Sequence, residues 1–172
     1  DTDDPLRVIK ESLKALNMDD KSFPPRSVLG YISRAKDDMQ LAEDFLEQAK
    51  AQGDFRLQKI GNVYLAYQKK LWAAGALDFD DIILHTVRLL QKFPEVREYY
   101  QRKFHYVLID EYQDTKHLQY LLAALLAGER KNICVVGDDD QSIYRFRGAT
   151  IENILSFECE YKIARVIRLE QN

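Results

Sequence analysis

The chain has few cysteines and no long apolar run, and each shortage narrows the possible function. Cys134 and Cys159 lack metal-ligand spacing, and Cys134 is predicted to be a small core residue because it lies within an apolar run. No eighteen consecutive residues are apolar, so we expect no membrane span, and the N-terminal residues are acidic, so we expect no signal peptide. The cysteine usage suits a reducing cytosol, so we expect a cytoplasmic protein. The net charge of −3 gives no global attraction to nucleic acid, so any nucleic-acid site has to be local.

The chain does contain enough apolar residues for a sizeable core in one or two domains, with 46% hydrophobic residues among 172. Residues 1 to about 103 are predicted to be helical, because apolar residues recur at helical spacing between proline and glycine breaks. The apolar stripes comprise Leu6, Ile9, Leu13 and Leu16, then Val28, Leu29, Ile32 and Ala35, then Ile60, Val63, Tyr64, Tyr67 and Leu71, and then Ile82, Ile83, Val87 and Leu90. Further helices are expected over 43–51 and around Tyr99, and Asp78 with Asp81 is expected to cap the helix that follows.

From Phe104 onward, short apolar runs alternate with helical stretches. The runs cover residues 106–109, 133–136 and 166–169, with helical stretches around 118–125 and 151–157. This order predicts a parallel sheet flanked by helices, in which the strand at 106–109 is buried on both faces. The chain stops directly after the third run, so we expect it to be part of a larger protein.

Two adjacent carboxylates, Asp110 and Glu111, follow the first of these strands. Ligands of open α/β sheets bind at the carboxyl ends of strands. One acid there can hold a hydrated Mg²⁺ that carries nucleotide phosphates, while the other orients or deprotonates the attacking water. The alternative is an ordinary solvated strand end.

The second strand is followed by a glycine, three aspartates and Gln141. In a parallel sheet Gln141 emerges at the same edge as the carboxylates, where its amide can hydrogen-bond a terminal phosphate; the alternative is a solvated turn. Beyond it, Tyr144 and Phe146 interleave with Arg145 and Arg147. Such aromatics can stack on unpaired bases, at roughly 1–3 kcal/mol per base, while arginine contacts phosphates. Alternatively, the aromatics fill a gap between sheet and helix, and Arg147 pairs with an aspartate.

Together these segments resemble the UvrD/Rep/PcrA group of superfamily 1 DNA helicases. The resemblance is strong over residues 77–172 and rests on three motifs, at 110–115, 136–149 and 169–172, and the upstream segment 77–82 also fits. It is looser over residues 1–76, where it rests on 30–33 and Lys36. The implied fold is α/β: the C-terminal portion of a RecA-like P-loop NTPase motor domain (βαβαβ, 77–172), preceded by an all-helical inserted subdomain (1–76).

The resemblance also implies roles for individual residues. They are Mg²⁺ binding by Asp110, the base for ATP hydrolysis at Glu111, coupling through Gln113 and Asp114, γ-phosphate sensing by Gln141, stacking on single-stranded DNA by Tyr144 and Phe146, and linkage of the DNA and nucleotide sides by Arg147. The implied parent is a 3′–5′ DNA helicase of repair or replication that uses ATP and Mg²⁺, binds single-stranded DNA and single-strand/duplex junctions, and works with its other helicase domains in cis.

The chain departs from the family pattern in what it leaves out. It has no Gly-x-x-x-x-Gly-Lys-Thr/Ser loop and no second motor domain, so we expect the isolated fragment to be inactive. A non-catalytic DNA-binding module that retains the helicase fold is one alternative, and a metal-dependent nuclease that uses the aspartates is another. Arg26, Arg34 and Lys36 form either a duplex-contacting surface or a solvated helix face.

Overall fold

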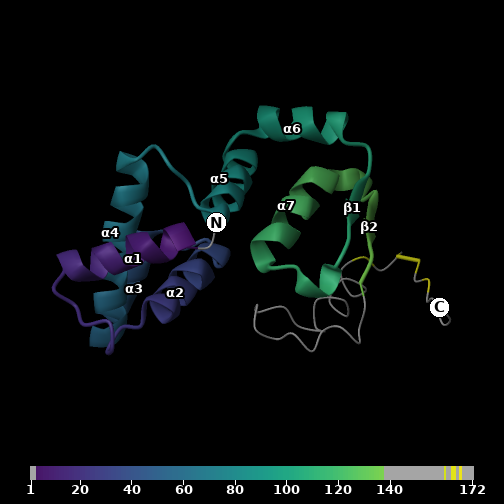
Figure 1. Ribbon diagram of the computed structural model, residues 1–172. Helices are drawn as coiled ribbons and strands as arrows, with labels where there is room; N and C mark the ends of the chain where they lie inside the picture. Colours follow the sequence, from purple (N-terminus) through teal and green to yellow (C-terminus); the bar gives the residue numbers. More distant parts are fainter. Residues whose placement is uncertain (1–2, 138–160, 162–163, 166, 168–172) are drawn as a thin grey trace. The chain divides into compact units, whose positions relative to one another are not determined.

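The computed structural model describes residues 3–137, 161, 164–165 and 167 (Figure 1). The chain divides into two compact units, Asp1–Phe93 and Pro94–Asn172. The helix that begins at Phe79 packs against α2 and belongs to the first unit. The boundary expected between residues 76 and 77 from the resemblance stays a prediction. Within the described residues, no helix combines the length and the apolar character needed to span a bilayer.

The described part of the first unit is helical, as the apolar periodicity predicted. Its helices are α1 (Asp3–Ala15), α2 (Pro25–Asp37), α3 (Ala42–Ala51), α4 (Phe55–Ala73) and α5 (Phe79–Lys92). The predicted stripes of α1, α2 and α4 meet in one core, which contains Ile9, Leu13, Val28, Ile32, Ile60, Val63, Tyr64, Tyr67 and Leu71. Burial of this shared core, rather than helix propensity alone, stabilises helices of this length.

Local sequence signals set the helix ends and the closest helix contact. The side chain of Asp54 caps α4 by accepting a hydrogen bond of 2.9 Å from the Leu57 amide. Asp78 and Asp81 form the predicted capping box at the start of α5. At Gly61, a Cβ atom would lie 3.1–3.2 Å from atoms of Leu46, so glycine permits the close approach of α4 to α3.

The buried face of α5 differs from the predicted one. Asp81, Leu84, Val87 and Leu90 are buried, whereas Ile82 is 50% exposed. Ile82 follows Asp81 by one position, which is about 100° around the helix. The assignment of Ile82 to the apolar face was therefore wrong, because the buried stripe begins with an acidic residue that a search for apolar residues passes over.

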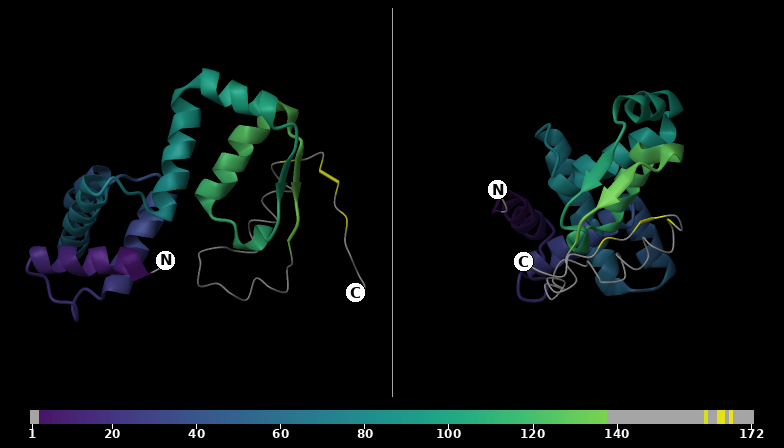
Figure 2. Two further views of the ribbon diagram at one scale, coloured as in Figure 1. Left: turned by 45° about the horizontal axis from the view of Figure 1, so that its top comes forward. Right: turned by 90° about the vertical axis from the view of Figure 1, so that its right-hand side faces the viewer.

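The described part of the second unit begins with α6 (Pro94–Lys103) and contains a two-stranded parallel sheet. Its further elements are β1 (Val107–Ile109), the 3₁₀ turn η1 (Tyr112–Asp114), α7 (His117–Ala127), the 3₁₀ turn η2 (Gly128–Arg130) and β2 (Ile133–Val135). The strands lie side by side (Figure 2), with Leu108 opposite Cys134. The predicted strand–helix–strand order is therefore confirmed as far as β2. The predicted helix over 151–157 and most of the third run at 166–169 lie outside the described residues, so the full βαβαβ order stays a prediction.

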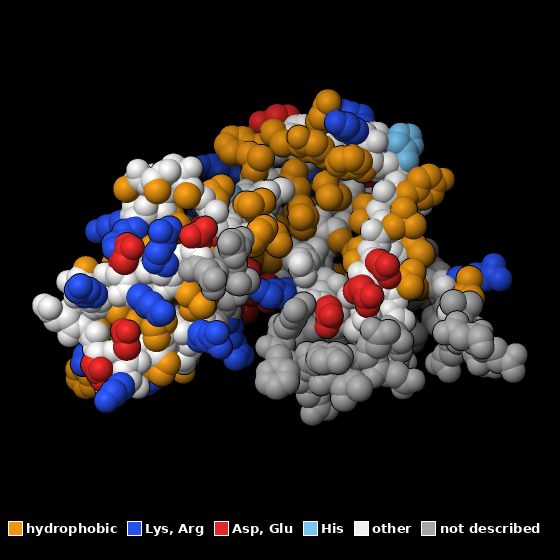
Figure 3. Space-filling model, viewed as in Figure 1, with side chains coloured by type: hydrophobic (Ala, Val, Ile, Leu, Met, Phe, Trp, Pro, Cys, Tyr) orange, Lys and Arg blue, Asp and Glu red, His pale blue; other side chains and the backbone are white. Residues whose placement is uncertain are grey.

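One face of the two strands is open among the described residues. Leu108 is 77% exposed and Cys134 is exposed, while Val107 and Ile109 are half-buried on the other face. Hydrophobic side chains are visible along this part of the surface (Figure 3). The predictions that the first strand is buried on both faces and that Cys134 is a core residue were wrong for the described chain. A short apolar run does not by itself supply the second layer that covers it.

Candidate functional site

The two predicted site carboxylates lie at the carboxyl end of β1. The strand ends at Ile109, and both Asp110 and Glu111 are exposed. Glu111 adopts a left-handed backbone conformation (φ 51°, ψ 43°), which is uncommon for a residue other than glycine. Its amide donates a hydrogen bond of 2.9 Å to Asp110 Oδ1. The chain therefore turns sharply at Glu111, and both carboxylates remain on the surface at the strand end.

Two backbone hydrogen bonds join this strand end to the end of β2. The Val136 amide donates to the Ile109 carbonyl at 2.8 Å, and the Tyr112 amide donates to the Val136 carbonyl at 2.9 Å. The chain after β2 consequently leaves the sheet at the edge that carries the two carboxylates, as the parallel order predicted. The remaining predicted site residues follow on that segment and lie outside the described residues: Gln141, Tyr144, Phe146 and Arg147.

A buried amide holds the exposed Glu111 carboxylate. Gln113 Nε2 donates to Glu111 Oε2 at 2.5 Å, and the Gln113 side chain is only 2% exposed. The Asp114 amide donates to the Glu111 carbonyl at 2.9 Å and so fixes the turn that places both residues. The structure thus brings Glu111, Gln113 and Asp114 together on one turn, with one Glu111 oxygen engaged and the other without a partner in the described chain.

The donor set at this strand end suits Mg²⁺ better than a metal that requires a cage of protein ligands. Mg²⁺ is commonly held by one or two carboxylates together with waters and substrate phosphates. Asp110 offers one such carboxylate, whose Oδ2 has no partner among the described residues. In the same residues, no three His, Cys, Asp or Glu side chains gather as a metal site. The aspartates invoked for a nuclease, residues 138–140, lie outside the described chain.

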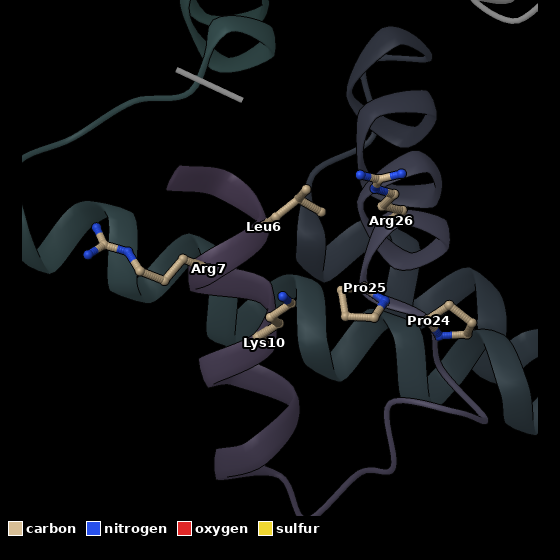
Figure 4. A pocket seen from close by; sticks show the side chains of 6 residues that line it. All are labelled: Leu6, Arg7, Lys10, Pro24, Pro25 and Arg26. Carbon is tan, nitrogen blue, oxygen red and sulfur yellow. The ribbon is translucent and has the colours of Figure 1, made fainter. Parts of the chain in front are cut away.

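The first unit carries a basic hollow of about 520 Å³ between α1 and the start of α2 (Figure 4). Its lining consists of Leu6, Arg7, Lys10, Pro24, Pro25 and Arg26, with no acidic residue among them. Arg7 pairs with Asp4 at 3.2 Å on the exposed side of α1. Lys10 and Arg26 have no ion-pair partner in the described chain, so the hollow presents two unneutralised cations beside an apolar floor.

The structure separates the three basic residues that the sequence grouped as one possible duplex-contacting surface. Arg26 lines the basic hollow and Arg34 is exposed, but Lys36 is fully buried. Lys36 therefore cannot touch DNA in this conformation. Its burial had a signal in the sequence, because Lys36 continues the four-residue spacing of Val28 and Ile32 on the buried stripe of α2.

The chain was also compared with known proteins. The family model for the UvrD/REP helicase N-terminal domain matches residues 1–162. All 172 residues align with the protein named "ATP-dependent DNA helicase PcrA" of Bacillus subtilis (strain 168) at 54% identity, and with the proteins of the same name from Staphylococcus epidermidis (strain ATCC 12228 / FDA PCI 1200) at 51% and Staphylococcus aureus (strain COL) at 50%. The chain covers 23% of the length of each relative. Because the family model matches most of the chain, the chain belongs to the UvrD/REP helicase family, in the region of its N-terminal domain.

Proposed function

We propose that the protein containing this chain is an ATP-dependent DNA helicase that moves 3′ to 5′ along single-stranded DNA and unwinds duplex DNA ahead of it. Membership of the UvrD/REP helicase family supports this proposal, as do the names of the relatives. The observation that carries it is the pair of exposed carboxylates, Asp110 and Glu111, at the carboxyl end of β1, with the buried Gln113 amide holding Glu111.

In this proposal each residue of the strand end has a defined task. Asp110 binds Mg²⁺, which neutralises charge on the ATP phosphates. Glu111 accepts a proton from the water that attacks the γ-phosphorus, the bond to the β–γ bridging oxygen breaks, and ADP and phosphate leave. Gln113, which shares the coupling role with Asp114, also positions Glu111, because it donates a hydrogen bond to Oε2 and leaves Oε1 available to accept the proton. The tasks proposed for the remaining residues are coupling by Asp114, γ-phosphate contact by Gln141, base stacking by Tyr144 and Phe146, and linkage of the two sites by Arg147.

The test is ATP hydrolysis by the full-length parent, with and without single-stranded DNA. Glu111→Gln should lower DNA-stimulated turnover by about 10²–10⁴-fold, the usual contribution of a general base, while nucleotide binding is retained. Glu129→Gln is the matched control, since Glu129 is an exposed acid on η2 of the same unit and is expected to have no effect. If the wild-type parent bound DNA but did not hydrolyse ATP, the result would instead support a non-catalytic DNA-binding module.

The direction of movement of the parent and the ATP hydrolysis of the isolated 172-residue chain need separate measurements. A duplex with a 3′ single-stranded tail should be unwound, and one with a 5′ tail should not. The 172-residue chain alone should not hydrolyse ATP, because its sequence lacks the glycine-rich loop that cradles phosphates. ATP hydrolysis by the purified 172-residue chain would contradict the expectation that it carries only part of the ATP site.

The basic hollow of the first unit is the part of the proposal that concerns duplex DNA at the junction. Lys10 and Arg26 supply positive charge without neutralising partners in the described chain, which suits phosphate contacts. In the parent, Lys10→Glu and Arg26→Glu should each weaken binding to the junction for all DNA sequences. Each should also reduce, by about 1 or more, the steepness with which the logarithm of the binding constant falls with the logarithm of the salt concentration. Lys50→Glu on α3, also exposed, is the control. Equal effects of all three variants on DNA binding would show that the basic hollow is not a specific part of the DNA-binding surface.

A further inference from the structure

A buried ionic cluster joins three helices of the first unit. Lys36 of α2 is fully buried, and its Nζ lies 2.6 Å from Asp78 Oδ2 and 2.7 Å from Asp81 Oδ1. The Tyr67 hydroxyl of α4 donates to Asp78 Oδ2 at 2.8 Å, and Gln68 Nε2 donates to Asp81 Oδ2 at 2.9 Å. Burial, followed by the charge of Asp78, raises the pKa of the Tyr67 phenol, which therefore remains a donor.

The same two carboxylates also build the first turn of α5. The Asp81 amide donates to Asp78 Oδ1 at 2.7 Å, and the Asp78 amide faces Asp81 Oδ2 at 3.4 Å. All four carboxylate oxygens are thus engaged, some by the cap and some by α2 and α4. Without Lys36, two buried acids within one turn would face each other with no cation, and the start of α5 would lose its attachment to α2.

The position of α5 in the chain gives this attachment a wider consequence. The helix is the last one of the first unit and ends at Lys92, and α6 of the second unit begins at Pro94. Only Phe93 separates the two helices. The chain that leads into Asp110 and Glu111 therefore departs from a helix whose first turn is fixed by Lys36.

We propose that Lys36 is a positioning residue for the motor. By holding α5 against α2, Lys36 couples ATP hydrolysis to unwinding. The inference rests on the proposed function. Lys36 touches neither nucleotide nor DNA in this role; it acts through Asp78 and Asp81 on the helix that connects the first unit to the unit that carries the hydrolysis residues.

The test is the number of base pairs unwound per ATP hydrolysed by the full-length parent carrying Lys36→Met. This ratio should fall by roughly fivefold or more, the lower end of typical coupling effects. Turnover on single-stranded DNA, where no duplex is opened, should stay within about twofold of wild type, because an intersite coupling need not alter the chemical step. Lys70→Met is the matched control, since Lys70 pairs with Glu11 at 3.2 Å on the surface of the same unit.

The ratio distinguishes coupling from loss of folded protein, because a smaller folded fraction lowers hydrolysis and unwinding together. If Lys36→Met lowered ATP hydrolysis and unwinding by the same factor, the ratio would not change and the proposal would be overturned. If Lys36→Met does not fold, Tyr67→Phe removes one donor to Asp78 and keeps the ion pairs, and it should lower the ratio to a smaller extent; no change in it would also overturn the proposal. Wild-type protein without turnover would refute the proposed function instead.

Discussion

Replacing Lys36 by methionine should reverse the pH dependence of stability of the first unit. In the wild type, burial alone would raise the pKa of the Asp78 carboxyl, but the Lys36 ammonium and hydrogen bonds from Lys36, the Asp81 amide and Tyr67 together hold this pKa below its usual value. The stabilisation is present above the unfolded-state pKa, about 3.9, and is lost as the pH falls through the depressed folded-state pKa.

In Lys36→Met the cation is gone and burial dominates. The pKa of Asp78 should then lie above that of the unfolded state, so that the folded form binds the additional proton. Stability should consequently fall as the pH rises from about 4 through the raised pKa, which is opposite in sign to the wild type. At pH 7 the loss should be about 3–5 kcal/mol, the cost of leaving a buried charge without its partner, and it should be smaller near pH 4.

Urea unfolding of the 172-residue chain at about pH 4 and about pH 7 measures this difference. The only tryptophan of the chain, Trp72 on α4, reports on the first unit through its fluorescence. Lys70→Met breaks a partly exposed ion pair and should cost no more than about 1 kcal/mol at either pH. If Lys36→Met were destabilised equally at both pH values, or no more than Lys70→Met, the buried cation would not be what keeps Asp78 ionised.

Gly30 on α2 and Gly61 on α4 should respond oppositely to replacement by alanine. Gly30→Ala should stabilise the first unit by about 0.5–1 kcal/mol, because the added methyl meets no atom within 4 Å and α2 gains helix propensity. Gly61→Ala gains the same propensity but presses on Leu46 at 3.1–3.2 Å, at a cost of about 1–3 kcal/mol, so it should be neutral to destabilising by about 2 kcal/mol. The urea midpoint followed by Trp72 fluorescence checks both, and equal shifts would contradict the close contact.

The features that the sequence predicted well are those set by residues close to one another in the chain. The helices of the first unit and the capping box of Asp78 depend on spacings of three or four residues, and all are present. The parallel pairing of β1 and β2 followed from short connections around one helix. The placement of Asp110 and Glu111 at a strand end depends on the same local order.

Burial was predicted less well because it depends on a second layer. Leu108 and Cys134 lie in apolar runs, and in a parallel sheet such runs are covered on both faces. Among the described residues α7 packs against β1, while the face that carries Leu108 and Cys134 is open. The apolar run correctly indicated a strand, but a covering layer is a property of tertiary structure and cannot be deduced from the strand itself.

Asp78 shows why a motif can be recognised correctly and still be understood only in part. Its Oδ1 accepts the amide of Asp81, three residues away, and this half of its role was predicted as a helix cap. Its Oδ2 accepts from Lys36, 42 positions away, and no local pattern links the two. Lys36 itself continues the apolar stripe of α2, so a lysine at a position suited to burial was the one available signal that a carboxylate had to lie nearby. A charged residue on an otherwise apolar helix face therefore indicates a distant partner of opposite charge, and such a partner can be sought among the acidic caps of other helices.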